Sequence, residues 1–260
     1  MIKFFRKIRQ NLIVENKTGK YIKYAIGEIV LVVIGILIAL QINNWNQNRL
    51  EQKREHQILK DLYVEFDANF NDLTRVKEQH EIVFNQFSGI QRITATKDYH
   101  SESLDSLMLS VTSWFSFTER PGASDNLINS GNLNILTNEE LRNLITQWSG
   151  IVDDVKDDEL FGAEFTRDTF LPFIAQTYPA SNIEYRHEQF YRTYTQNKSL
   201  EITPIIGQKT VDWATFLNIP EFQSLLSLRK IYEMHSIAEV EVALEACKKI
   251  RNLIDSELKQ

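Results

Sequence analysis

LKDLYVEFDANFNDLTRVKEQHEIVFNQFSGI, residues 59–90, carries the pattern that decides the fold. Positions suited to a core recur here at alternating intervals of three and four residues: Leu59, Leu62, Phe66, Asn69, Leu73, Val76, His80, Val83, Phe87 and Ile90. That alternation is the period of one face of an α-helix. The sequence therefore predicts a long helix whose single stripe faces partner helices.

The residues before this helix are apolar enough to cross a membrane. Residues 24–42 read YAIGEIVLVVIGILIALQI, about 19 residues, which at a rise of about 1.5 Å each nearly cover a hydrocarbon layer of roughly 30 Å. Tyr21 and Tyr24 at one end and Trp45 at the other suit the membrane–water interfaces. No A-x-A-like cleavage site follows, so we expect an uncleaved transmembrane helix over residues 21–45.

Charge sets the expected orientation of this helix. Residues 1–45 hold seven of the 29 Lys and Arg residues and two of the 35 acids, which leaves 22 basic and 33 acidic residues beyond position 45. Basic flanks stay in the cytoplasm. We expect a basic cytoplasmic tail at 1–20 and a domain outside the cytoplasm at 46–260. An acidic domain also argues against nucleic acid as a partner.

Three residues of the apolar span are candidates for contact with another helix. Glu28, Gly35 and Ala39 share one helix face, and the two small residues form a small-xxx-small pair that allows close approach. A carboxylate in a span is costly and is a functional candidate by default. Two other interpretations of Glu28 stay open. In one it has no function and only lies at the lipid edge, and in the other its carboxylate relays protons.

Beyond the stalk at 43–57 and the stripe, the rest of the chain favours an all-helical domain. We expect a short helix at 103–117 and a long helix that begins with a capping box at Thr137 and Glu140. A last helix runs from Pro220 to Leu258, and the segment near 178–219 is irregular. The predicted fold is mainly α: a transmembrane helix that continues into a stalk helix and an antiparallel bundle of about four helices.

The apolar positions of the later helices also form stripes. In the long central helix they are Leu141, Leu144, Trp148, Ile151 and Val155. In the last helix one stripe comprises Leu225, Leu228, Tyr232 and His235, and a second comprises Val240, Leu244, Cys247, Ile254 and Leu258. We expect both helices to pack through these faces.

A resemblance rests on KTGKYIKYAIGEIVLVVIGILIALQINNWN at 17–46, with LINSGNLNILTNEELRNLI at 127–145 and DWATFLNIPEFQSLL at 212–226 as weaker patches. The chain resembles a family of uncharacterised membrane proteins of the Bacteroidetes, known only as a domain of unknown function. The resemblance implies a single-span topology and a periplasmic outer domain in a Gram-negative cell. It implies no activity.

The chain shows no motif for catalysis, a cofactor or a metal. It has no HExxH, CxxC or GxSxG, and its one cysteine, Cys247, cannot form an intramolecular disulfide. His80 and His235 lie on the predicted stripes, where we interpret them as core residues satisfied by a neighbouring carboxylate. The acidic run at 153–159 is interpreted as a solvated helix face.

The densest polar and aromatic group in the irregular segment is a second candidate site. Tyr185, His187, Tyr191 and Tyr194 lie close together in the sequence, in a connection of the kind that often carries binding residues. We expect either a loop that binds a partner or ligand or a loop whose aromatics cover the end of the bundle.

These observations favour a periplasmic interaction or scaffold module that is anchored in the inner membrane and is not an enzyme. The alternative is an accessory or sensor subunit of an inner-membrane complex, which contacts partner helices through Glu28. Its expected partners are the lipid bilayer and either a second copy of the chain or another membrane protein.

Overall fold

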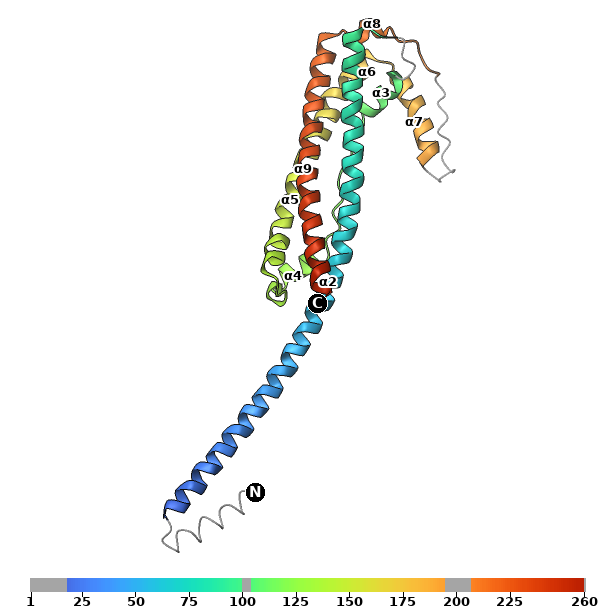
Figure 1. Cartoon of the computed structure of the whole chain (residues 1–260). Coiled ribbons are helices and arrows are strands. Elements are labelled where there is room, and N and C mark those ends of the chain that lie inside the picture. Colours follow the sequence, from blue (N-terminus) through green and yellow to red (C-terminus); the bar gives the residue numbers. More distant parts are fainter. Residues whose placement is uncertain (1–17, 100–103, 195–206, 260) are drawn as a thin grey trace. The chain divides into compact units, whose positions relative to one another are not determined.

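Helices are the only regular elements in the described part of the chain, which comprises residues 18–99, 104–194 and 207–259 of a computed structural model (Figure 1). In chain order they are α2 (Thr18–Thr96), α3 (Leu104–Val111), α4 (Ala123–Asn129), the 3₁₀ turn η1 (Leu133–Ile135), α5 (Glu139–Phe165), the π turn η2 (Thr166–Phe170), α6 (Leu171–Thr177), α7 (Ala180–Tyr194), α8 (Trp213–Phe216) and α9 (Pro220–Leu258). The expected mainly helical fold is confirmed.

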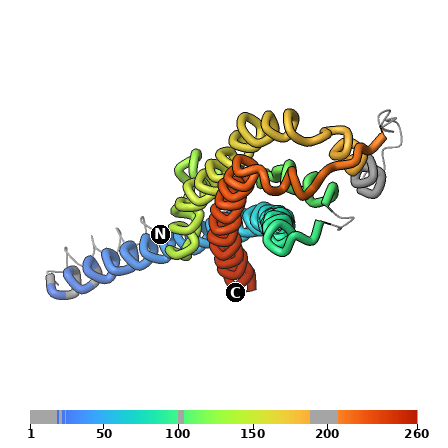
Figure 2. The backbone as a smooth tube through the Cα atoms, turned by 90° about the horizontal axis from the view of Figure 1, so that it is seen from above, coloured from blue at the N-terminus to red at the C-terminus, as the bar shows by residue number. Residues whose placement is uncertain are grey.

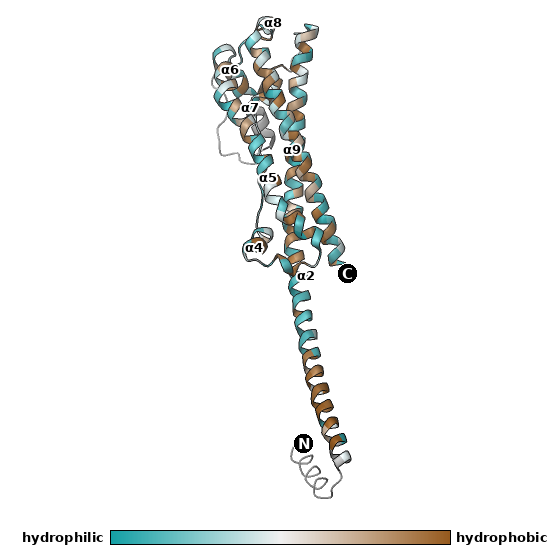
Figure 3. Cartoon of the chain, turned by 90° about the vertical axis from the view of Figure 1, so that its left-hand side faces the viewer, coloured by the Kyte–Doolittle hydropathy of each residue, from teal (hydrophilic) through white to brown (hydrophobic). Residues whose placement is uncertain are grey.

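Helix α2 contributes to both compact units of the chain, Met1–Gln57 and Ile58–Gln260. In the first unit its apolar residues form an unbroken run, which the hydropathy colouring shows as a brown stretch of the helix (Figure 3). Ile29 is 63% exposed and Ile42 is 61% exposed. This long, apolar and exposed segment has the length and composition of a single membrane anchor.

The second unit is built around α2, α5 and α9, and α9 runs antiparallel to α2. Arg251 of α9 pairs with Asp67 of α2 at 2.5 Å, and Lys230 of α9 donates to Gln91 of α2 at 2.9 Å. The end of α9 thus lies beside the earlier part of α2, and the beginning of α9 lies beside the later part of α2.

Helix α5 packs on α9 in the same antiparallel sense. Asn138, just before α5, donates to Glu257 at 2.7 Å, whereas the Phe165 ring at the other end of α5 lies 5.1 Å from the Tyr232 ring. In the views from the side and from above, α9 runs alongside both α5 and α2 (Figures 1 and 2).

The stripe that decides the fold is confirmed at every position. All ten of its residues, from Leu59 to Ile90, are buried. The eight apolar ones enter two apolar cores along the bundle. Leu59 to Val76 join one core with α5 and the second half of α9, and Val83 to Ile90 join the other with α3, α6, α8 and the start of α9.

The boundaries of α5 differ in detail from those predicted. The N-cap is Asn138, whose side chain accepts a hydrogen bond from the amide of Leu141 at 3.0 Å, so the capping residue lies one position after Thr137. A π turn at η2 ends α5, and Pro172 then occupies the first turn of α6, where its missing N–H is not needed.

Two expectations about the shorter elements are wrong in part. The helix expected at 103–117 ends at Val111, and residues 113–121, which we call the strap, are not helical. The segment expected to be irregular contains α7, which follows Pro179. Asn182 of α7 is fully buried, and its side chain bonds both the amide and the carbonyl of Lys209.

The first stripe of α9 is also wrong in part. Leu225 is buried, but Leu228 and His235 are exposed. The buried face instead includes Phe222, Leu226, Arg229, Glu233 and Ser236. It continues through Val240, Cys247 and Ile254 of the second predicted stripe, which are buried as expected.

Candidate functional site

A layer of charged side chains separates the two apolar cores. His80 of α2, Glu159 of α5, and Arg229 and Glu233 of α9 form it, and each side chain is at most 3% exposed. The position of the layer follows from helix periodicity, because each residue occupies the buried face of its own helix. Charges buried this deeply persist only when they are paired and hydrogen-bonded.

The contacts of the layer form a continuous chain from α5 to α9. His80 Nε2 lies 3.3 Å from Glu159 Oε1, and His80 Nδ1 lies 2.5 Å from Glu233 Oε1. The other oxygen of Glu233 accepts from Arg229 Nη1 at 2.5 Å. The Arg229 guanidinium also lies 5.6 Å from the centre of the Phe87 ring.

Both ring nitrogens of His80 face carboxylate oxygens, which favours the doubly protonated imidazolium. A neutral imidazole has one N–H and can donate to one carboxylate only. Burial lowers the pKa of His80, but the hydrogen bonds and negative charges of Glu159 and Glu233 outweigh burial and raise the pKa to about 9. With His80 protonated, two positive and two negative charges balance in the layer.

The strap is tied to this layer through its backbone. The Phe117 amide donates to both oxygens of Glu159, at 3.1 and 2.9 Å, and Arg229 Nη2 donates to the Ser113 carbonyl at 3.2 Å. Phe117 itself is buried in the apolar core that contains Leu59 to Val76. Glu159 therefore joins His80 on one side to the strap on the other.

Side chains of α2 hold the rest of the strap and the helix that follows it. Asp72 accepts from the Thr118 amide at 3.1 Å, and Asn69 accepts from the Arg120 amide at 2.9 Å. Buried Glu65 then accepts from both the amide and the hydroxyl of Ser124, in the first turn of α4. Burial raises the pKa of Glu65, although the hydrogen bonds from Ser124 oppose the rise.

The charged layer does not resemble a metal centre. The two nitrogens of His80 point to different carboxylates, and Glu233 is already paired with Arg229. Within the described residues, no three His, Cys, Asp or Glu side chains converge on one point that a metal could occupy. The layer is suited to holding charge and a proton inside the bundle.

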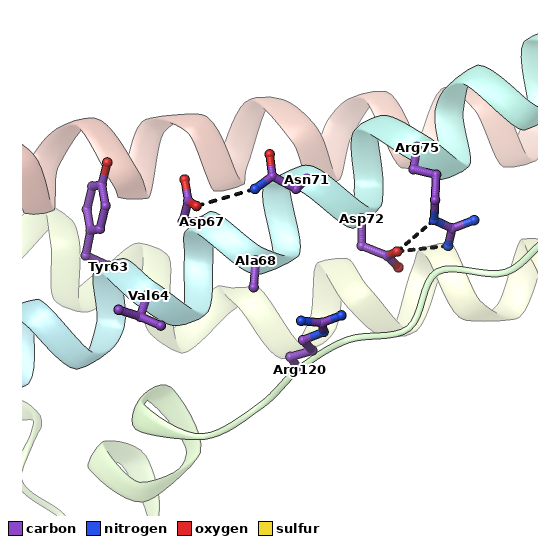
Figure 4. A pocket seen from close by; sticks show the side chains of 8 residues that line it. All are labelled: Tyr63, Val64, Asp67, Ala68, Asn71, Asp72, Arg75 and Arg120. Carbon is purple, nitrogen blue, oxygen red and sulfur yellow. Dashed lines mark hydrogen bonds and ion pairs between the residues drawn. The ribbon is translucent and has the colours of Figure 1, made fainter. Parts of the chain in front are cut away.

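An open surface groove of about 520 Å³ lies beside the strap (Figure 4). It is lined by Tyr63, Val64, Asp67, Ala68, Asn71, Asp72, Arg75 and Arg120. Arg120 reaches from the strap toward α2, and Arg75 pairs with Asp72 at 2.8 Å. The polar side chains on α2 mostly bond each other, so they do not converge on the space in the groove.

The structure places the predicted contact residues of the apolar segment on an accessible face. Gly35 and Ala39 are exposed, and a Cβ added at Gly35 would meet no atom within 4 Å. Glu28 is half-buried on the same face. Their predicted role in helix contact stays a prediction.

The second predicted site lies on a helix rather than in a loop. Tyr185, His187, Tyr191 and Tyr194 all fall within α7. Tyr185 is half-buried and His187 is exposed. Residues two apart on a helix do not face each other, so these two do not form one site. The side chains of Tyr191 and Tyr194 lie outside the described residues.

The sequence interpretation found one member of the charged layer and missed three. It placed His80 correctly as a core residue satisfied by a carboxylate. It grouped Glu159 with the acidic run, whose members Asp153, Asp154 and Asp157 are indeed exposed. The missed signal was spacing: Glu159 follows Val152 and Val155 at the intervals of the buried stripe of α5.

Cys247 is a buried core residue without a disulfide. Its Sγ lies 3.2 Å from the Phe66 carbonyl oxygen, and burial raises the pKa of the thiol to about 12. Since the thiolate is the reactive form, this cysteine is suited to packing rather than to chemistry.

A sequence profile of a family of unknown function, DUF6090, matches residues 28–152. The matched region begins at Glu28 in the apolar segment of α2 and ends in α5. No significant match is found among curated proteins or among solved structures.

Proposed function

We propose that the chain is an interaction module of the inner membrane, with a cytoplasmic N-terminus, one transmembrane span and a periplasmic helical domain. The observation that carries the proposal is the exposed apolar segment of α2. Large apolar side chains cover it on all sides, at exposures of 45–63% between Ile29 and Leu40. Such a surface is costly in water and favourable in lipid.

The charge distribution supports the proposed orientation. Seven basic residues precede the span, whereas the residues beyond position 45 carry an excess of acids. Positive residues resist translocation, so the tail remains inside and the acidic domain crosses.

A face of the span supports the interaction role. Gly35 and Ala39 lie on it four residues apart, and nothing fills the space above Gly35. Small residues at this spacing let two helix backbones approach closely in lipid, where packing drives association. Glu28, near one end of the same face, adds a group that can hydrogen-bond across two helices.

A second candidate function is an accessory or sensor subunit of a larger membrane complex. The position of Glu28 in the span favours it, because a carboxylate can accept a hydrogen bond from a polar group on a partner helix. The two functions differ in whether the helix partner is a copy of this chain or another protein.

The test is site-specific photo-crosslinking of the full chain in its native membrane. A photo-reactive amino acid at Ala39 lies on the proposed contact face, and one at Leu37 lies on the opposite side as the matched control. We expect a protein adduct from position 39 and mainly lipid adducts from position 37.

The mass of the adduct separates the two functions. Twice the mass of the chain identifies a homodimer, and any other protein identifies a larger complex. If both positions give lipid adducts alone, the span is only an anchor and the proposed contact face is refuted.

A further inference from the structure

We propose that the strap, residues 113–121, is a proton-controlled gate: it stays closed while His80 carries a positive charge and opens when His80 loses its proton. The proposal concerns the helical domain alone and does not depend on the partner of the membrane span. Its basis is the direct chain of contacts from His80 through Glu159 to the Phe117 amide.

The charges that face His80 come from two neighbouring helices. Glu159 faces it from α5 and Glu233 faces it from α9, and Arg229 of α9 contacts Glu233 from the far side. The charged neighbours of His80 on α2 itself, Lys77 among them, form ion pairs at the surface. Loss of the His80 proton therefore changes the buried layer from neutral to a net charge of −1.

The two carboxylates are not affected equally by that loss. Glu233 keeps Arg229 as a cationic partner at 2.5 Å. Glu159 loses its only cationic partner in the layer, and keeps the Phe117 amide and at most the single N–H of the neutral His80 ring. A buried carboxylate with no cation carries a large desolvation penalty, which water relieves if it can reach the group.

When the strap moves away from the bundle, water can reach the Glu159 carboxylate. The strap bonds directly to Glu159, and it has no helical hydrogen-bond ladder of its own. The amides of Phe117, Thr118 and Arg120 donate instead to side chains of α5 and α2. The three long helices around it each carry a continuous backbone ladder, so local opening of the strap disrupts fewer bonds.

The pKa of His80 gives the direction and the pH range of the gate. The closed state raises this pKa to about 9, whereas a hydrated histidine has a value near 6.5. Opening therefore releases a proton between these two values. The equilibrium constant for opening rises roughly tenfold per pH unit across the range.

The experiment is amide hydrogen exchange of the full chain in detergent micelles or nanodiscs, from pH 6.5 to pH 9. After correction for intrinsic base catalysis, the protection of the Phe117 and Thr118 amides should fall roughly tenfold per pH unit. The amides of α9 around Ile250 should keep more protection than the strap, because the opening is local.

Two variants complete the test. His80→Gln removes the charge, so the strap amides should lose protection at every pH and the pH slope should vanish. Lys156→Ala removes an exposed ion pair with Glu119 of the strap and should leave the slope unchanged. The wild-type slope stands as a test even if His80→Gln does not fold.

Two results would overturn the gate. One is a strap whose corrected protection in the wild type is independent of pH. The other is exchange of strap and α9 amides together at all pH values, which would mean that only global unfolding exposes the strap.

Discussion

At the scale of single residues, the charged layer joins long-range contacts into one unit. His80 lies 79 residues from Glu159 and 153 residues from Glu233 in the sequence, and its ring meets both. The arrangement holds only in one register of α2, α5 and α9, because a shift by one helical turn would bury each charge against apolar side chains. The layer therefore specifies the alignment of the bundle more than it adds stability.

Replacing His80 by glutamine should destabilise the domain strongly. The substitution removes the cation between Glu159 and Glu233 and leaves Glu159 without a charged partner, at an expected cost of about 3–5 kcal/mol in the free energy of unfolding. Urea unfolding followed by circular dichroism measures it. His235→Gln is the matched control, since His235 is exposed and the change should cost less than about 0.5 kcal/mol. Equal effects of the two substitutions would contradict the assigned role of His80.

The same histidine predicts how stability depends on pH. Its pKa is raised in the folded state to about 9 from an unfolded value of 6.5, so its contribution is fully present below pH 6.5. The contribution is lost as the pH rises toward 9, and the total loss is on the order of 3 kcal/mol. Urea midpoints measured from pH 6 to pH 9.5 should fall for the wild type. They should change much less for His80→Gln, and parallel curves for the two proteins would refute the linkage.

At the scale of elements, the N-terminus of α5 depends on one side chain. Asn138 accepts from the Leu141 amide at 3.0 Å and donates to Glu257 of α9 at 2.7 Å. It both caps one helix and ties it to the end of another. Because Glu257 lies in the last turn of α9, this contact joins the beginning of α5 to the end of α9.

Substitution of Asn138 by alanine should cost about 1 kcal/mol in the free energy of unfolding, the usual loss for an N-cap, plus the bond to Glu257. Thermal unfolding followed by circular dichroism measures the shift in the midpoint. Asn143→Ala is the control, since Asn143 is exposed within α5 and alanine has the higher helix propensity. A cost at position 138 no greater than that at 143 would rule out the capping role.

The long helices were predictable because their periodicity is regular over many turns. The stripe of α2 was correct at every position, including the polar Asn69 and His80. The bounds of α9 were also correct, since Pro220 fixes its first turn. Its first buried face was misassigned because Leu228 and His235 repeat at helical spacing too, and the true face there carries the polar Arg229 and Glu233.

The strap and α7 were not predictable from local pattern. Residues 113–117 are serines and aromatic residues, which mark neither a helix nor a turn. Their conformation depends on acceptors such as Glu159 that lie far away in the sequence. Helix α7 is polar on average, and the buried residue that fixes its start, Asn182, is polar too. Tertiary contacts decide both segments.

At the scale of the whole molecule, the chain combines two units with opposite surface chemistry. The unit Met1–Gln57 carries an apolar helix whose side chains are exposed on every side. The unit Ile58–Gln260 buries its apolar residues in two cores and pairs its buried charges. The first is suited to lipid and the second to water, so the proposed single-span topology gives each unit the solvent that it needs.

The most direct test of this topology is a pair of reporters fused after Gln260 of the full chain and expressed in a Gram-negative host. One reporter is active only in the periplasm, and the other is active only in the cytoplasm. The account predicts that the periplasmic reporter is active and that the cytoplasmic reporter is inactive. Both fusion proteins should be found in the membrane fraction. Activity of the cytoplasmic reporter, or recovery of the fusions in the soluble fraction, would contradict it.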